Sequence, residues 1–260
     1  MNNILVTGGA GYIGSHICKV FYNSGFKPIA FDNLSTGNKW SVKWGELEVG
    51  DLNNKDRLKE VFEKYKFLGV VHLAALSNVE QSCNNPILYY KNNLLGSYNL
   101  LENMTKFKVD KLVFSSTAAV YGNPIYSPID EKHPLSPMSP YGEAKGHADV
   151  LVRSCGDKIG TASLRLFNVF GPGQSDNSPY SSVIALFRKK ILAGENLTIY
   201  GDGSATRDFV HVDDVVLAFT MCAEELLEKG TDSPCSGEAF NVCTGEISTI
   251  RELAELCIEM

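Results

Sequence analysis

The sequence contains no apolar run long enough to cross a membrane and no cluster of Lys or Arg. The first absence excludes a membrane-spanning helix. The second, together with a formal net charge of -6 from 24 basic and 30 acidic residues, argues against a nucleic-acid partner. The N-terminus also lacks the order of basic, apolar and small residues that marks a signal peptide, so we expect a cytoplasmic protein.

Disulfide and metal-binding patterns are absent as well. None of the seven cysteines forms a C-x-x-C pair, so we interpret them as reduced thiols. The five histidines show no metal-ligand spacing, and we expect no metal site. With 260 residues, 44% of them hydrophobic, the chain is long enough to bury a sizeable core as one large domain, alone or with a small lobe.

Short apolar runs alternate with helical patterns over the first two thirds of the chain. The runs are continuous and rich in β-branched residues, which is typical of strands in a parallel sheet covered on both faces. This alternation predicts an α/β fold with a doubly wound, Rossmann-type parallel sheet. The predicted strands are 3–7, 27–32, 69–75, 111–116 and 161–167, with a weaker one at 45–52, and the predicted helices are 12–24, 55–66, 86–107 and 141–155.

The pattern changes after residue 170. The stretch FGPGQSDNSPYS is dense in Gly, Pro and Ser and indicates a linker or mobile loop. A helix is predicted at 181–193, followed by the strand-like NLTIYGDG and by TRDFVHVDD. We therefore predict a Rossmann domain at 1–172 and a smaller substrate-binding lobe at 173–260, of which 207–220 returns to pack on the first domain. Because the chain ends inside the helical pattern TIRELAELCIEM, we expect this lobe to be C-terminally incomplete.

A glycine motif links the first predicted strand to the first predicted helix. In TGGAGYIGSH the glycines Gly8, Gly11 and Gly14 have the spacing G-x-x-G-x-x-G. Glycines let the backbone turn tightly and approach a ligand closely, and the free N–H groups of the helix that follows suit a pyrophosphate. The same spacing occurs in plain turns, but its position between a strand and a helix indicates dinucleotide binding.

Asp32 ends the second predicted strand, 18 residues beyond Gly14. A carboxylate at this position accepts hydrogen bonds from the ribose hydroxyls of adenosine and repels a 2′-phosphate, so NAD is favoured over NADP. The alternative is a loop aspartate that caps the following NLSTG. Together with the glycines, Asp32 predicts that 1–172 is an NAD-binding domain.

Tyr141 and Lys145 lie four residues apart in SPYGEAKGHADVL, at the start of a predicted helix. The two side chains therefore share one face of the helix, and the ammonium favours the phenolate of Tyr141. A hydroxyl from FSSTAAVYG, at the end of the strand 111–116, could assist the proton transfer. The alternative is a tyrosine that simply packs at the helix start.

These motifs occur together in one order. TGGAGYIGS, FDN, GDL, HLAA, NNLLGS, FSSTAAVYG, YGEAK, RLFNVFGPG and RDFVHVDD run through essentially the whole chain. In this the chain resembles the extended short-chain dehydrogenase/reductase family. Among its members the chain is most similar to the nucleotide-sugar 4-epimerases of the UDP-glucose (UDP-galactose) kind.

The resemblance implies roles for individual residues. The catalytic set falls on Thr117, Tyr141 and Lys145. The implied cofactor-binding residues are Gly8, Gly11, Tyr12, Ile13, Gly14, Asp32, Asn33, Thr36, Asp51, Leu52, Leu73, Ala74, Ala75, Asn93, Ser115, Tyr141, Lys145 and Phe167. The implied residues for a UDP-sugar substrate are Thr117, Asn168, Thr198, Tyr200 and Arg207. The family also implies a homodimer, with the helices 86–107 and 141–155 at the subunit interface.

Structural readings compete with several of these roles. Arg207 could pair with its neighbour Asp208, which we interpret as structural, and Asn168 could cap the loop after its strand. Thr198 and Tyr200 could be ordinary core-strand residues. Asn92 and Asn93 are poor helix formers inside a predicted helix, which suggests a polar task for one of them.

Three alternatives to an epimerase stay open. The related 4,6-dehydratases carry an acidic residue after the triad hydroxyl, whereas here Ala118 and Ala119 follow Thr117, which disfavours dehydration. A nucleotide-sugar reductase would use the same catalytic set but consume its cofactor. The incomplete lobe leaves room for a truncated, non-catalytic NAD-binding module.

Overall fold

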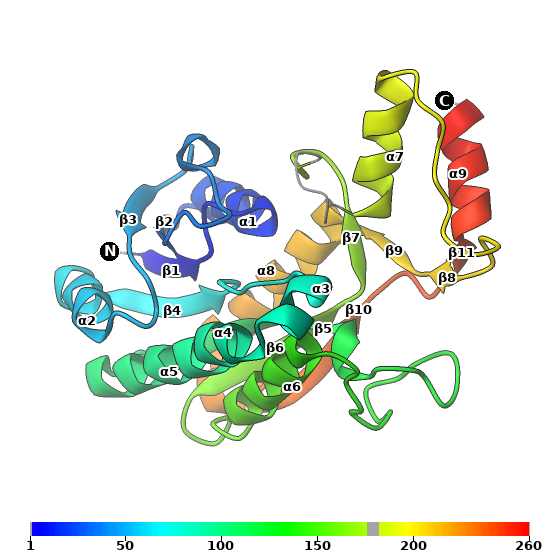
Figure 1. Ribbon diagram of the computed structural model, residues 1–260. Helices are drawn as coiled ribbons and strands as arrows, with labels where there is room; N and C mark the ends of the chain where they lie inside the picture. The colour runs from blue at the N-terminus through cyan, green and yellow to red at the C-terminus, as the bar shows by residue number, and fades with distance from the viewer. Residues whose placement is uncertain (1, 176–181, 260) are drawn as a thin grey trace.

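The computed structural model describes residues 2–175 and 182–259. Its centre is a seven-stranded parallel sheet in the order β10-β6-β5-β4-β1-β2-β3, with helices on both faces (Figure 1). The predicted doubly wound fold is thereby confirmed. The sheet strands are β1 Asn3–Thr7, β2 Lys27–Asp32, β3 Glu46–Val49, β4 Phe67–His72, β5 Lys111–Thr117, β6 Gly160–Leu166 and β10 Glu238–Val242.

Two short sheets lie outside the central one. One joins β7 (Asn168–Phe170) to β9 (Phe209–His211) in parallel, and the other joins β8 (Thr206–Arg207) to β11 (Ser248–Thr249) in antiparallel fashion. The helices are α1 Tyr12–Asn23, α2 Lys55–Lys64, α3 Val79–Asn84, α4 Pro86–Tyr89, α5 Gly96–Phe107, α6 Pro140–Arg153, α7 Val183–Leu192, α8 Val212–Lys229 and α9 Ile250–Glu259. Shorter turns are η1 Lys39–Ser41, the π-helix η2 Tyr90–Leu95, η3 Ala118–Val120 and η4 Gly230–Asp232.

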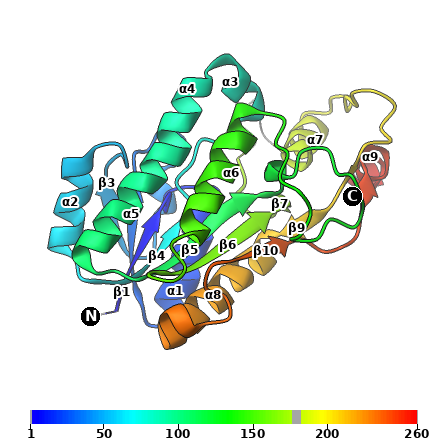
Figure 2. The ribbon, with the colours of Figure 1, turned by 90° about the horizontal axis from the view of Figure 1, so that it is seen from below.

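The strands read as continuous apolar runs because both faces of the sheet are buried. In β1, Ile4 and Val6 belong to the core beneath α1 and α8, whereas Leu5 belongs to the core beneath α2, α5 and α6. All three side chains are at most 2% exposed. Figure 2 shows α5 and α6 side by side on one face, with α1 and α8 on the other. Burying each such side chain contributes about 2 kcal/mol, which makes the sheet the rigid frame of the site.

Two predictions about local structure, the strand 69–75 and the strand-like NLTIYG, were wrong in extent or in kind, whereas the helix 86–107 is confirmed with one irregularity. The predicted strand 69–75 ends at His72, because the next residues leave the sheet. The predicted helix 86–107 contains the π-helix η2 in its middle, at the two asparagines that fit a helix poorly. The strand-like NLTIYG is irregular backbone, in which Leu197 and Ile199 pack against α7 and α9 instead of forming a strand.

The chain beyond residue 172 contributes to both parts of the molecule. α8 packs against α1 and against β4, β5 and β6, and β10 joins the main sheet beside β6. This fits the expected return of 207–220 to the first domain, while the division at 172 stays a prediction. Part of the predicted linker and the first residue of the predicted helix 181–193 lie in 176–181, outside the described residues; Ser182 caps α7, which begins at Val183.

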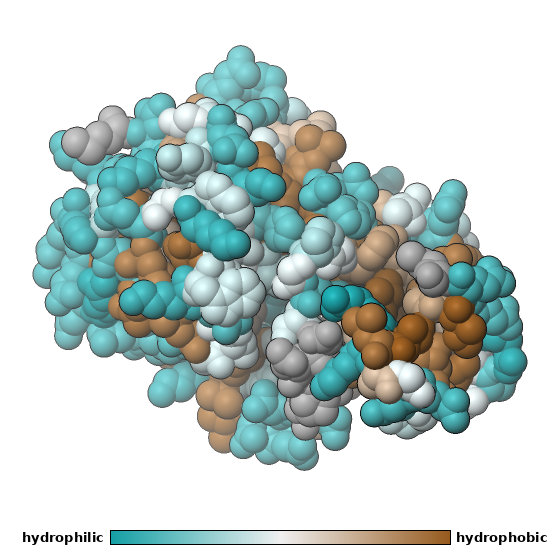
Figure 3. Space-filling model, turned by 90° about the horizontal axis from the view of Figure 1, so that it is seen from above, coloured by the Kyte–Doolittle hydropathy of each residue, from teal (hydrophilic) through white to brown (hydrophobic). Residues whose placement is uncertain are grey.

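A third, small core holds α7 and α9 together. Phe187 from α7 packs against Leu253 and Ala254 from α9. Figure 3 shows apolar surface at the end of the molecule where these helices lie. Leu192 and Ile258, 73% and 67% exposed, are among the apolar side chains that stay uncovered there.

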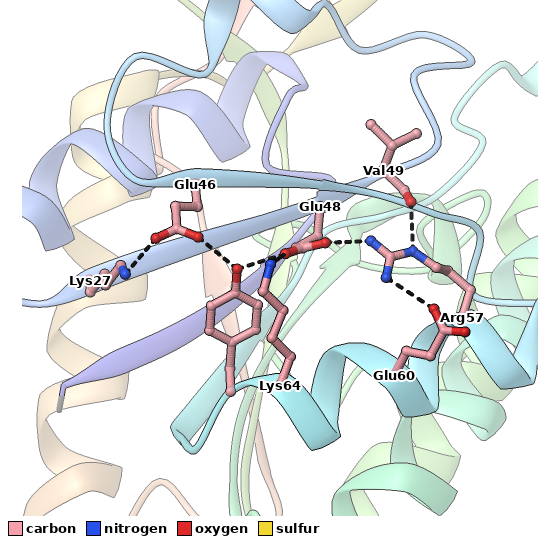
Figure 4. Close-up of polar contacts among 8 residues, drawn as sticks. Lys27, Glu46, Glu48, Val49, Arg57, Glu60 and Lys64 are labelled. Atoms are coloured by element: carbon pink, nitrogen blue, oxygen red, sulfur yellow. Dashed lines mark hydrogen bonds and ion pairs between the residues drawn. The ribbon is translucent and has the colours of Figure 1, made fainter.

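A charged network ties the edge strand β3 to α2 (Figure 4). Glu48 on β3 accepts hydrogen bonds from Arg57, from Lys64 at 2.6 Å and from the Tyr65 hydroxyl at 2.6 Å. Arg57 also donates to the carbonyl of Val49, the last residue of β3. Charges along this edge discourage pairing with another strand and fix the end of β3, from which the chain continues to Asp51.

Glu48 should make the fold acid-sensitive. Burial raises its pKa, but the hydrogen bonds from Lys64, Tyr65 and Arg57 outweigh this and lower the pKa to about 2. Since the folded-state pKa lies below the ordinary 4.5, the carboxylate stabilises the fold above pH 4.5, and this contribution is lost as the pH falls towards 2. We expect Glu48→Gln to lower the unfolding free energy by about 2 kcal/mol at neutral pH, and by progressively less in acid.

Urea unfolding of both proteins across this pH range measures the effect. Glu60→Gln is the matched control, because Glu60 is exposed and makes a single surface pair with Arg57. It should change stability by less than about 0.5 kcal/mol. A Glu48→Gln protein as stable as the wild type at neutral pH would contradict this account.

Candidate cofactor and catalytic site

An open cleft lies at the carboxyl ends of β1, β2 and β4. At this point the strand order reverses direction, because β2 lies on one side of β1 and β4 on the other. Doubly wound sheets bind ligands at such a switch point. The cleft is lined by Gly8, Gly11, Phe31, Asp32, Asn33, Ser35, Thr36, Gly50, Asp51, Leu52, Leu73, Ala74, Ala75, Leu76 and Asn92.

The glycine turn between β1 and α1 packs too tightly for side chains. A Cβ on Gly14 would lie 2.1 Å from the carbonyl oxygen of Gly8. Gly8 has a φ of +72°, and its Cβ would lie 2.8 Å from the backbone nitrogen of Ala74. Gly11 is the N-cap of α1, and no side chain caps the helix start. The first N–H groups of α1 are therefore left for a ligand, as a pyrophosphate requires.

Two aspartates line the cleft. Asp32 accepts hydrogen bonds from the backbone nitrogens of Ala10 at 3.0 Å and Leu34 at 2.8 Å, which fix its carboxylate beside the glycine turn. Asp51 accepts from the Asn33 side chain at 2.8 Å and from the Asn53 backbone at 2.8 Å. Burial raises the pKa of Asp51, but these hydrogen bonds hold it below its ordinary value, so it is ionised at neutral pH.

The three predicted catalytic residues meet at the carboxyl end of β5. Thr117 is the last residue of β5, and Tyr141 lies in the first turn of α6. Pro140 and the capping hydroxyl of Ser139, 3.1 Å from the Gly142 nitrogen, start this helix here. Burial raises the pKa of the Tyr141 phenol, and a hydrogen bond with the Thr117 side chain lowers it in part.

Lys145 is buried one turn after Tyr141. Its ammonium donates a 2.5 Å hydrogen bond to the carbonyl oxygen of Ser115 and lies 4.1 Å from the ring centroid of Phe114. Burial lowers the pKa of Lys145 to about 7, while the charge of Asp149 raises it in part. The sequence predicted that Lys145 acts on the tyrosine through its charge. In the structure its hydrogen bond goes to the strand, and burial is the largest influence on the pKa of Tyr141.

The predicted substrate residues follow the main sheet on the side of the small lobe. The Asn168 side chain donates to the carbonyl oxygen of Asp208 at 2.9 Å, so its amide joins β7 to the chain just before β9. Arg207 is exposed and donates to the carbonyl of its neighbour Thr206. Asp208 accepts from Thr244 and Gly245, which supports its interpretation as a structural residue rather than a partner of Arg207.

Thr198 and Tyr200 lie apart from the cleft, on irregular backbone. Thr198 is exposed and accepts from the Lys190 ammonium at 2.6 Å. Tyr200 is 91% exposed. Neither is a core-strand residue, so that alternative is wrong; their role in substrate binding stays a prediction.

Several predicted cofactor residues support the cleft instead of lining it. Gly14 packs beneath the turn, and Asn93 holds Leu76 in place through two hydrogen bonds of 2.9 Å. The Tyr12 hydroxyl is buried without a hydrogen-bond partner in the described part of the chain, beside Gly171. Ile13, Ser115, Tyr141, Lys145 and Phe167 also lie outside the lining of the cleft.

The structure adds cleft residues that the motifs did not include. They are Phe31, Ser35, Gly50, Leu76 and Asn92. Each of the five is next in sequence to a residue that was predicted, so extending each motif by one residue would have found them. Asn92 could also have been found from its residue type, because it is a poor helix former inside a predicted helix.

Among residues 2–175 and 182–259, no three His, Cys, Asp or Glu side chains lie close enough together to hold a metal ion. Within the same ranges, no helix combines the length and the apolar character needed to cross a membrane.

Known proteins resemble this chain over nearly its whole length. A UDP-glucose 4-epimerase from Rhizobium meliloti is 37% identical over 268 aligned residues, which cover 98% of this chain and 80% of that protein. The chain thus spans about four fifths of that relative. The crystal structure of a UDP-glucose 4-epimerase from Thermotoga maritima with UDP-glucose has a TM-score of 0.91 at 35% identity, covering 99% of this chain and 82% of that one.

A UDP-glucose 4-epimerase from Brucella ovis, solved in complex with NAD, has a TM-score of 0.89 at 33% identity and covers 98% of this chain and 81% of that one. The model of the NAD dependent epimerase/dehydratase family matches residues 4–243. The resemblance drawn from the motifs is confirmed, and the chain belongs to the NAD dependent epimerase/dehydratase family.

Proposed function

We propose that this chain interconverts UDP-glucose and UDP-galactose by inverting the configuration at C4 of the sugar. The observation that carries the proposal is the meeting of Thr117, Tyr141 and Lys145 at the sheet edge that also forms the dinucleotide cleft. The relatives named UDP-glucose 4-epimerase, at 37% identity and with a matching fold, support the same reaction.

NAD is the cofactor of this family, and the described residues fit it. The glycine turn offers uncapped N–H groups to the pyrophosphate, and its backbone packs so closely that a Cβ on Gly8 or Gly14 would overlap neighbouring backbone atoms. Asp32 stands where the adenosine ribose hydroxyls would lie, and its charge repels a 2′-phosphate. When bound, NAD supplies reversible hydride transfer at C4.

In the mechanism we propose, the protein moves one proton. Tyr141, acting as the phenolate, takes the proton of the 4-hydroxyl on its phenolic oxygen, and the Thr117 hydroxyl holds that oxygen by a hydrogen bond. The sugar becomes a 4-keto sugar, turns over and regains its hydrogen at C4 on the other face. Tyr141 then returns the proton to O4, so the protein ends in its starting state.

The remaining site residues orient the reactants. The Lys145 side chain is fixed by its hydrogen bond to the Ser115 carbonyl. When Lys145 is ionised, its charge next to the reaction centre favours release of the phenolic proton of Tyr141. Arg207, which is exposed at the lobe, would engage the diphosphate, with Asn168 beside β9. Anchoring the nucleotide while leaving the sugar free allows the keto sugar to turn over.

The other activities considered for this chain fit less well. A 4,6-dehydratase needs an acid next to Thr117, but η3 presents Ala118 and Ala119 there. A reductase would consume its cofactor stoichiometrically, and a non-catalytic NAD-binding module would not need the catalytic set.

A conversion assay tests the proposal. The purified chain, without added reductant, should convert UDP-galactose to UDP-glucose with no net accumulation of NADH. Bound NAD without conversion would leave the non-catalytic module as the better account. Stoichiometric consumption of NADH would favour a reductase.

Tyr141→Phe should abolish this conversion, by at least about a thousandfold, because it removes the group that carries the proton. The variant should keep its NAD, since the hydroxyl is not part of the cleft lining. Tyr22→Phe, at a surface tyrosine of α1 that is 54% exposed, is the matched control. Near-normal turnover by Tyr141→Phe would refute the mechanism.

Gly14→Ala should prevent NAD binding, because the added methyl would overlap the Gly8 carbonyl that shapes the turn. The NAD content of the purified protein, measured after denaturation, reports the effect. Gly146→Ala is the control, since a Cβ there meets only ordinary contacts with Val120 at 3.8 Å. If Gly14→Ala retained a full complement of NAD, the glycine turn would not be the pyrophosphate site.

We also propose a cytoplasmic location and a homodimer. All seven cysteines are free thiols, which suits a reducing compartment. Apolar side chains are exposed on neighbouring helices: Leu95 of η2 at 43%, Tyr98 of α5 at 47% and Val150 of α6 at 48%. An apolar face shared by two adjacent helices is typical of a two-fold interface.

Val150→Lys should convert this dimer into a monomer, because it buries an ammonium in an apolar interface. Light scattering coupled to size-exclusion chromatography measures the mass. Leu217→Lys on α8, whose side chain is 56% exposed on the other face of the sheet, should leave the dimer intact. A wild-type monomer would contradict the proposal.

A further inference from the structure

His72, the last residue of β4, is held between two hydroxyl groups inside the protein. Its side chain is 1% exposed. Nδ1 lies 2.6 Å from the Thr7 hydroxyl oxygen, and Nε2 lies 2.9 Å from the Ser97 hydroxyl oxygen. Both ring nitrogens therefore have a partner, one from the end of β1 and one from α5.

The neighbouring hydrogen bonds decide which nitrogen carries the proton. Ser97 donates its single hydroxyl proton to the carbonyl oxygen of Asn93 at 2.6 Å, so towards His72 it can only accept. Nε2 must then be protonated, and Nδ1 accepts from Thr7. The ring is neutral, because burial and the charge of Lys145 lower the pKa of His72 to about 3.

Both ends of this chain of hydrogen bonds reach the cleft wall, which we define as residues 73–76. At one end the Thr7 hydroxyl accepts from the backbone nitrogen of Ala74 at 3.3 Å. At the other end Asn93 accepts from the nitrogen of Leu76 and donates to its carbonyl, both at 2.9 Å. The network thus joins the end of β1, the π-helix η2 and the wall between them.

We propose that His72 is a positioning residue for the cofactor: through Thr7 and Ser97 it fixes the distance between the glycine turn and the cleft wall. The protons between Ala74 and the Asn93 carbonyl all point one way, from Ala74 through Thr7 to Nδ1 and from Nε2 through Ser97 to that carbonyl. Removing one member leaves a buried polar atom unpaired, and the wall shifts to relieve it. The inference rests on the proposed function, since it takes the ligand of the cleft to be NAD.

The experiment measures how fast bound NAD exchanges with isotopically labelled NAD in the intact holoenzyme. Thr7→Val keeps the shape of a fully buried residue and loses only the hydroxyl, and Ser97→Ala loses the other link. Each should release NAD about tenfold faster than the wild type. Thr105→Val is the control: it loses the same kind of bond within α5, to the Leu101 carbonyl at 2.9 Å, and should release NAD within twofold of the wild type.

Melting temperatures of the same proteins separate positioning from stability. Unchanged NAD release in Thr7→Val and Ser97→Ala, even with lower melting temperatures, would show a merely structural network and overturn the inference. Equal acceleration in Thr105→Val would overturn it too. A wild-type chain that holds no NAD would overturn the proposed function together with the inference, which distinguishes this failure from the other two.

Nitrogen NMR of ¹⁵N-histidine-labelled protein gives a second readout. It reports which ring nitrogen of His72 is protonated and does not depend on a change in protein stability. At neutral pH we expect the His72 ring to show a protonated Nε2 and an unprotonated Nδ1. Thr7→Val should shift the Nδ1 resonance and Ser97→Ala the Nε2 resonance, which assigns both without replacing the ring. A protonated Nδ1, or a cationic ring, would contradict the inferred direction of the network.

Discussion

The site depends on how closely two backbone segments approach each other at the switch point of the sheet. The turn after β1 and the wall after β4 touch so tightly that a Cβ on Gly8 would lie 2.8 Å from the Ala74 nitrogen. A parallel sheet buried on both faces makes this approach possible. It pairs Thr7, the last residue of β1, with His72, the last residue of β4, so the two strands end side by side. The space left above the contact is the cofactor cleft.

The catalytic side depends on a second constraint, the anchoring of α6 against the sheet. Asp149 on α6 and Arg165 on β6 form an ion pair at 3.2 Å, with both side chains at most 1% exposed. Arg165 also donates to the Tyr121 hydroxyl, which in turn donates to Asn241 on β10. Such a pair is costly to bury and strongly destabilising to break, so it specifies one position for the helix. The first turn of this helix carries Tyr141, and the next carries Lys145.

These two constraints come together at buried, ionisable side chains. Burial lowers the pKa of His72 and keeps its ring neutral, and the charge of Lys145, whose own pKa burial lowers to about 7, acts in the same direction. The neutral ring fits the one-way hydrogen bonds that tie the cleft wall to the glycine turn. Cofactor cleft and catalytic set are therefore linked through the interior of the protein, as well as through a ligand that would span them.

The sequence predicted the parts of this arrangement that arise from local patterns. Continuous apolar runs located the strands, and the glycine spacing located the turn, because both signals lie within a few neighbouring residues. Strand β10 was missed, because EAFNV is short and, as an edge strand, carries a polar residue on each face. The hydrogen bonds of His72 could not be predicted, because they join β1, β4 and α5, whose approach is set by the packing of the whole domain. The π-helix was not predicted either.

The central claim is that one site removes the hydrogen from C4 of a sugar and returns it to the same carbon. The most direct test mixes UDP-galactose carrying deuterium at C4 with UDP-galactose carrying only ¹³C, and analyses the UDP-glucose formed by mass spectrometry. The account predicts that deuterium stays at C4 and stays with the molecules that lack ¹³C. Deuterium lost to water, or transferred to the ¹³C-labelled molecules, would contradict it.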